Sequence, residues 1–198
     1  MSVVVTGRVI VVGILAAVCV CADSRSAKRE KKQRERIEEL SQKLSRRLAM
    51  SKPSEEHAFL HERAAALIER LKKSRNDEYV FDRLARAANS VLEASERIFD
   101  SLAQDDNEDD TKEKAARNLQ RYYFRLQQAD YFGNMSGDPD WKTFARHSRM
   151  LYQKARSAFD AGSYRKAKKL GEASSYLVGA LENLAQAAVR VPDPPRLK

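Results

Sequence analysis

His57 and His61 are the first residues whose spacing points to chemistry, because they lie one turn apart on a predicted helix. Such a pair can present two imidazoles to one metal ion. The interval between them holds no glutamate of the metalloprotease type, and neither histidine follows a glutamate by three residues as in di-iron bundles. The third histidine, His147, is distant in sequence. We therefore predict two partly exposed surface histidines and no metal site.

An acidic run at residues 105–110 begins like a calcium loop, with Asp, Asn and Asp at alternate positions. The pattern then fails, because Asp110 replaces the turn glycine and Ala116 stands where the loop needs a bidentate glutamate. Carboxylates that precede a helix favour the positive end of its dipole and keep a loop hydrated. The run predicts a solvated helix entry, with loose cation binding as the alternative.

Catalytic motifs are missing from the rest of the sequence as well. The chain contains no nucleophile elbow, no phosphate-binding glycine loop and no dinucleotide fingerprint. Both cysteines, Cys19 and Cys21, lie in the first 22 residues, so the remaining chain offers no thiolate and no disulfide. Titratable groups spread over exposed helical faces make poor acid-base pairs. The sequence predicts a protein that is not an enzyme and uses no cofactor.

The first 22 residues are typical of a secretory signal peptide. Arg8 precedes an apolar run at residues 9–20, which is shorter than the about 20 residues that a membrane-spanning helix needs. Val20 and Ala22 suit the two pockets of a signal peptidase, which places the cut between Ala22 and Asp23. We predict a signal peptide at residues 1–22 and export to the periplasm or the extracellular space.

Residues 23–36 form a predicted basic helical arm that also supports a second topology. Arg8 is the single basic residue before the apolar run, and seven follow it: Arg25, Lys28, Arg29, Lys31, Lys32, Arg34 and Arg36. Positive charge tends to stay on the cytoplasmic side of a membrane. The alternative to export is therefore a short uncleaved membrane anchor with a cytoplasmic domain.

Six helices are predicted after the arm begins, because Ala, Leu, Arg, Glu and Lys dominate the composition. The breaks between them fall at residues 51–54, 76–77, 105–110, 137–139 and 161–163, with Asp138 as the N-cap of the fifth helix. A helical bundle domain is expected over residues 37–190, followed by a proline-rich extended tail at residues 191–198.

Apolar residues in these helices alternate steps of three and four. The predicted seams are Ile37, Leu40, Leu44 and Leu48; Phe81, Leu84, Ala88, Val91, Ser95, Ile98 and Leu102; Leu119, Tyr122, Leu126 and Ala129; Trp141, Phe144, Ser148, Leu151, Ala155 and Ala158; and Ala167, Leu170, Ser174, Leu177, Leu181, Leu184 and Ala188. This period predicts an all-α, elongated antiparallel bundle of about six helices in hairpins, with left-handed packing. The sixth helix is flanked by small residues on both sides of its seam, so we expect it at the centre.

The hairpin at about residues 151–174 has a regular set of small and apolar positions. These are Leu151, Ala155, Gly162 in the turn, Tyr164, Ala167 and Ser174. At this spacing the hairpin resembles a single tetratricopeptide repeat, although Lys154, Ala158 and Gly171 replace bulkier residues of that family and no second copy precedes it. The resemblance implies a role in protein interaction.

One surface on the fourth helix has the composition of a protein-interaction site. Phe124 and Tyr131 lie seven residues apart, opposite the seam and beside Arg117, Arg121 and Gln128. Exposed aromatic rings flanked by arginines are typical of interface hot spots. The alternative is that the first or second helix covers these two rings.

A basic face is predicted on the fifth helix and the start of the sixth. It comprises Lys142, Arg146, Arg149, Arg156, Arg165, Lys166, Lys168 and Lys169. Such a face is usually only solvated, but with a net charge of +9 it also suits nucleic acid, acidic glycans or lipid headgroups.

The main functional hypothesis is an exported, non-enzymatic scaffold protein of the cell envelope that binds a protein partner. A basic binder of an anionic polymer or a membrane surface is the second hypothesis. A carrier of a small ligand in a bundle cavity is the third.

Export is testable on the protein itself. Cell fractionation with N-terminal sequencing should find a mature chain that starts at Asp23 in the envelope or the medium. An intact Met1 on membranes, with the bundle accessible from the cytoplasm, would show the anchored topology instead.

Overall fold

The computed structural model describes residues 6–50, 55–102, 111–135 and 139–189. Six helices make up these segments: α1 (Thr6–Met50), α2 (Glu55–Lys73), α3 (Glu78–Asp100), α4 (Lys112–Asn134), α5 (Pro139–Asp160) and α6 (Tyr164–Val189). The described segments contain no strand. The predicted all-α bundle of six helices is confirmed.

Helix ends follow the local chemistry of the sequence. The Asp77 side chain accepts a hydrogen bond from the backbone N–H of Val80 at 3.1 Å and so caps α3. Thr111 caps α4 in the same way through Lys114. Gly162 has a φ of +79° in the turn between α5 and α6, a conformation that glycine adopts without strain. The cap predicted at Asp138 lies outside the described residues.

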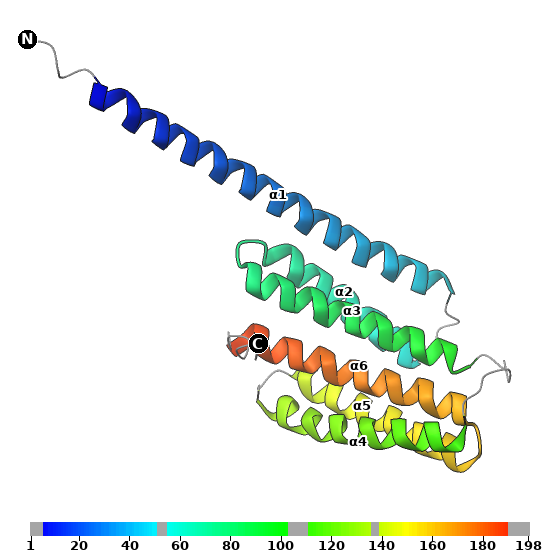
Figure 1. Ribbon diagram of the computed structural model, residues 1–198. Helices are drawn as coiled ribbons and strands as arrows, with labels where there is room; N and C mark the ends of the chain where they lie inside the picture. The colour runs from blue at the N-terminus through cyan, green and yellow to red at the C-terminus, as the bar shows by residue number, and fades with distance from the viewer. Residues whose placement is uncertain (1–5, 51–54, 103–110, 136–138, 190–198) are drawn as a thin grey trace, which may run out of the picture.

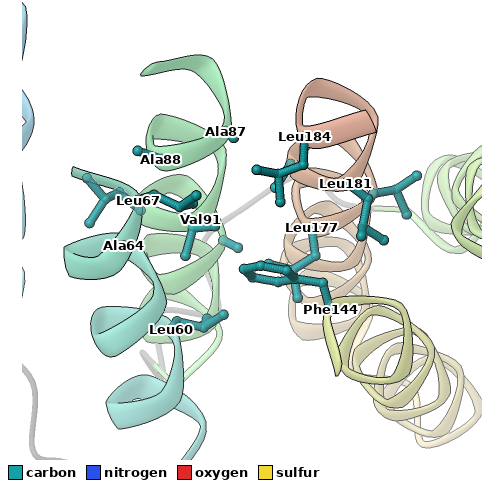
Figure 2. Packing of buried hydrophobic residues seen from close by; sticks show 14 of the residues in the cluster. Leu60, Ala64, Leu67, Ala87, Ala88, Val91, Phe144, Leu177, Leu181 and Leu184 are labelled. Carbon is teal, nitrogen blue, oxygen red and sulfur yellow. The ribbon is translucent and has the colours of Figure 1, made fainter. Parts of the chain in front are cut away.

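The helices form two three-helix units that share one core. Successive helices run antiparallel, α1 packs on the outside of α2 and α3, and α4 packs on the outside of α5 and α6 (Figure 1). The two units meet where α3 lies along α6. Figure 2 shows Phe144 and Leu177 extending toward Leu60 and Val91 across this junction, and all four side chains are buried.

Helix α6 is the central element, as predicted, because α3, α4 and α5 all pack against it. Of two glycines on α6, one is required by this close packing. A Cβ atom built on Gly171 would overlap the Tyr122 ring of α4, with 2.8 Å to Cε2. A Cβ atom on Gly179 would lie 3.8 Å from Ser90 Oγ of α3, an ordinary contact distance. Gly171 is therefore the position where the backbone of α6 meets a ring directly.

The buried seams of α1, α3 and α6 end earlier than the sequence predicts. Ile37 and Leu40 are buried against α2 and α3, but Leu48 is exposed. Leu102 is exposed as well, because α3 ends at Asp100. Ala188 is also exposed near the end of α6. At all three positions the apolar repeat of the sequence continues past the last buried position of its seam.

The sequence predicts that the whole basic arm at residues 23–36 projects from the bundle. In the structure only part of it does. Gln33 is buried and its amide donates a hydrogen bond to the backbone oxygen of Arg75 at 3.1 Å. One helical turn earlier, Arg29 lies 3.9 Å from Glu78. Helix α1 therefore docks on the α2–α3 turn before its apolar seam begins, and it extends beyond the bundle only on the N-terminal side of this contact (Figure 1).

Opposite charges border the docked part of α1. Lys43 forms an ion pair with Glu93, and Arg47 lies 2.5 Å from Glu96, both on α3. Their side chains are largely shielded from solvent, which strengthens such pairs relative to surface pairs. Helix α1 is thus held by a short apolar seam with ionic contacts beside it.

No helix in the described segments combines the length and the apolar character needed to cross a membrane. Residues 1–5, and the side chains of residues 6–26, lie outside the description. The signal peptide at residues 1–22 and the cut between Ala22 and Asp23 stay predictions, as does the tail at residues 191–198.

Two alanine substitutions on α6 test the close approach of α4. Gly171→Ala should destabilise the protein by about 1 to 3 kcal/mol, because the buried Tyr122 ring must move. Gly179→Ala is the matched control and should leave stability unchanged or raise it by up to about 1 kcal/mol, because alanine favours helices. Urea denaturation measures both. Equal effects of the two substitutions would contradict the packing described here.

Candidate functional site

Helix α4 has one buried face and one exposed aromatic face. Ala115, Leu119, Tyr122, Ala129 and Gly133 are buried against α5 and α6. On the other side, Phe124 is 60% exposed and Tyr131 is 66% exposed. Among the described residues α1 and α2 make no contact with α4, so the alternative that one of them covers these rings is wrong.

The three polar residues predicted beside the exposed rings, Arg117, Arg121 and Gln128, are exposed as well. The Arg121 guanidinium also lies over the ring of Tyr122, 5.3 Å from the ring centre. Burial raises the pKa of the Tyr122 phenol, and the nearby Arg121 opposes part of that effect. All five residues predicted as one surface of α4 are therefore open to solvent.

The exposed rings of α4 make contacts that continue toward α5. Phe124 packs edge-on against Tyr123 at 6.3 Å between ring centres, and Tyr123 in turn lies 5.9 Å from Tyr152 of α5. Tyr131 packs against Phe132 at 5.5 Å. An aromatic surface thus extends from the exposed face of α4 to the side of α5.

An open groove of about 420 Å³ lies between α4 and α5. It is lined by Ala116, Leu119, Gln120, Tyr123, Tyr152, Arg156 and Phe159, and we call it the α4–α5 groove. Tyr123, Tyr152 and Phe159 were not predicted as site residues, because they lie outside the predicted seams. A signal was available, because Tyr152 and Phe159 are seven residues apart, as are Phe124 and Tyr131.

The predicted basic face divides in the structure. Lys142, Arg146, Arg149 and Arg156 of α5 and Lys166 of α6 are exposed, and Arg149 forms an ion pair with Asp130 of α4. Arg165, Lys168 and Lys169 are half-buried, and Lys169 lies 3.8 Å from Asp100. Of this predicted face, the exposed positive charge is therefore mainly on α5.

His57 and His61 are buried, which contradicts the prediction of two partly exposed surface histidines. Their exposed fractions are 2% and 5%, because α2 is covered by α3 on one side and its imidazoles face the interior. His61 Nε2 lies 2.9 Å from the hydroxyl oxygen of Ser95 on α3, and the two imidazole rings are 6.2 Å apart. These histidines belong to the packing of α2 on α3.

Burial lowers the pKa of His61 below its ordinary value of 6.5, and the nearby His57 and Arg47 lower it further. No cluster of three or more metal-binding side chains occurs in the described segments. The acidic run at residues 105–110 lies outside them.

Comparison of the chain with family models, with curated proteins and with solved structures found no match. The hairpin of α5 and α6 contains the segment that resembles a tetratricopeptide repeat, and that resemblance stays a prediction. The function of the protein is therefore inferred from the geometry of its own residues.

Protonation of His61 should destabilise the fold. Because its pKa is lower in the folded chain than in the unfolded chain, the stability it contributes is present above about pH 6.5 and is lost as the pH falls below that value. Urea denaturation at pH 7.5, 6.5 and 5.5 should show this loss. The variant His61→Gln should lose less stability at low pH than the wild type. His147→Gln is the control, because His147 is half-buried and stacks on Phe59, and it should lose as much stability as the wild type. The same pH dependence in both variants would contradict this role.

Proposed function

We propose that this protein is an exported, non-enzymatic scaffold of the cell envelope that binds another protein through the outer face of α4. The observation that carries this proposal is the exposure of Phe124 and Tyr131 on a helix whose other face is buried. A helix that used all its apolar residues for folding would keep such rings covered.

The distribution of exposed apolar side chains supports a dedicated surface on α4. Of the six large hydrophobic side chains exposed in the described segments, four lie on α4 or at its C-terminal cap: Tyr123, Phe124, Tyr131 and Met135. Aromatic side chains release much apolar surface from water on binding and lose little conformational entropy. A concentration of them on one helix is typical of an interface.

Export and the lack of catalysis rest on the sequence. The apolar run before Asp23 and the suitable Val20 and Ala22 favour secretion. The absence of cysteines after Cys21 is compatible with a protein that relies on an apolar core outside the cell.

Binding of an anionic polymer or a membrane surface is the second candidate function. It is favoured by the exposed basic side chains of α5, among them Lys142, Arg146 and Arg156. Such binding falls steeply as salt concentration rises, whereas an interface centred on apolar rings loses little. The salt dependence of binding therefore separates the two candidates.

Removal of the two exposed rings should abolish partner binding without unfolding the chain. Purified Phe124→Ala/Tyr131→Ala protein should retain the circular dichroism of the wild type, because neither ring is core. Truncation of a hot-spot ring costs about 2 kcal/mol, so the loss of both rings should weaken binding by about a thousandfold and remove capture of the partner from envelope extract.

The matched control removes an exposed apolar side chain elsewhere. Leu48→Ala on α1 should leave capture unchanged. Capture that survives in the double variant but disappears at high salt would favour the anionic ligand instead. Unfolding of the double variant would show that the rings serve the core.

A further inference from the structure

The lining of the α4–α5 groove repeats with the period of a helix seam. On α4, Ala116 and Tyr123 are seven residues apart and both line the groove. On α5, Tyr152 and Phe159 show the same interval. Two antiparallel helices that present side chains at this interval form a groove into which a third helix can place its own apolar heptad positions.

The rings of the groove are positioned by the folded core. Tyr152 and Phe159 are half-buried and pack against the main apolar cluster, and Phe159 also contacts Tyr164 at 5.4 Å between ring centres. Tyr123 reaches the groove from the opposite helix and lies against Tyr152. Rings held in this way are pre-organised, so a ligand loses little binding energy to ordering them.

The charged side chain in the lining of the groove is Arg156 of α5, and it is exposed. Lys142 and Arg149 precede it at intervals of seven residues but lie outside the lining, and Arg149 pairs with Asp130 at the far end of α4. A segment that enters the groove therefore meets the Arg156 guanidinium, which favours a carboxylate in the ligand at that point.

The fold already contains a contact of this design. Helix α1 docks on α2 and α3 through Ile37 and Leu40, and its basic Lys43 pairs with Glu93 of α3. In that contact the outer helix is basic and the surface acidic. In the α4–α5 groove the charged residue of the lining is Arg156, so the complementary helix is one that carries carboxylates beside its apolar stripe. A second copy of the chain is disfavoured, because each copy has a net charge of +9.

We propose that the α4–α5 groove binds an acidic amphipathic helix of the partner protein, whose apolar stripe covers Tyr123, Tyr152 and Phe159 and whose carboxylates pair with Arg156. This inference rests on the proposed function and adds the chemistry of the partner. The exposed Phe124, next to Tyr123, would extend the contact with the partner helix onto the outer face of α4.

Synthetic helices test the inference on the mature chain. The probe is a fluorescent peptide of three heptads with leucine at the a and d positions and mainly glutamate elsewhere. One comparison peptide has lysine in place of glutamate, and another has the same composition in an order without amphipathic spacing. Fluorescence anisotropy should show saturable binding of the leucine-glutamate helix and at least about tenfold weaker binding of both comparison peptides.

Two pairs of variants locate the binding. Arg156→Glu should weaken binding of the leucine-glutamate helix by about tenfold, whereas Arg146→Glu, an equal charge change on α5 outside the groove lining, should change it by less than about twofold. Tyr123→Ala should also weaken binding by about tenfold, with Leu102→Ala, two residues after the end of α3, as the control. Circular dichroism confirms that each variant remains folded.

The outcomes separate this inference from the proposed function. One contrary result is that the peptide without amphipathic spacing binds as tightly as the leucine-glutamate helix, and another is that Arg146→Glu and Arg156→Glu weaken binding equally. Either result would show attraction by charge alone and would overturn the proposal that the groove is the binding site. Binding of vesicles rich in anionic lipid that depends on Arg156 and Tyr123, without peptide binding, would assign the groove to a membrane surface. A third result is that the Phe124→Ala/Tyr131→Ala protein loses partner capture while the wild-type chain binds no leucine-glutamate helix. This result would support the proposed function and contradict the proposal that the partner segment is an acidic helix.

Discussion

The structure depends on the close packing of α6 against the helices around it. Gly171 lets the ring of Tyr122 on α4 reach the α6 backbone. Helix α6 also packs along α3, so the unit of α1, α2 and α3 and the unit of α4, α5 and α6 share a single core. Ion pairs join the units beside it, as between Arg97 and Glu172 at 3.1 Å.

This packing explains why the aromatic surface is on α4 and not elsewhere. Helices α1 and α4 both pack on the outside of the bundle, but their outer faces differ. Helix α1 ends its seam early and carries charged residues outward, whereas α4 keeps Phe124 and Tyr131 in contact with solvent. Helix α4 is also fixed to both α5 and α6, so its rings and those of α5 form a surface of defined shape.

Much of the fold followed from periodicity, whereas the site followed only in part. The steps of three and four placed α3, α5 and α6, and Asp77 marked the start of α3 correctly. The position of Phe124 and Tyr131 on the face of α4 opposite its seam could be predicted because it depends on one helix. Whether another helix covers the two rings could not be predicted in this way. The α4–α5 groove could not, because it depends on how two helices are rotated against each other. His57 and His61 were misplaced for a related reason, since α2 contacts α3 and also reaches α5 through Phe59 and Phe144.

The long N-terminal helix gives the position of the signal-peptide cut a mechanical meaning. Toward the N-terminus, α1 continues past the Arg29–Glu78 contact as a rod. At 1.5 Å per residue this rod measures about 35 Å from Thr6, about 13 Å from Val20, where the apolar run ends, and about 10 Å from Asp23. An uncut chain anchored through the apolar run would therefore hold the bundle about 13 Å from the membrane, whereas a cut chain would keep a helical stub of nearly the same length without the anchor.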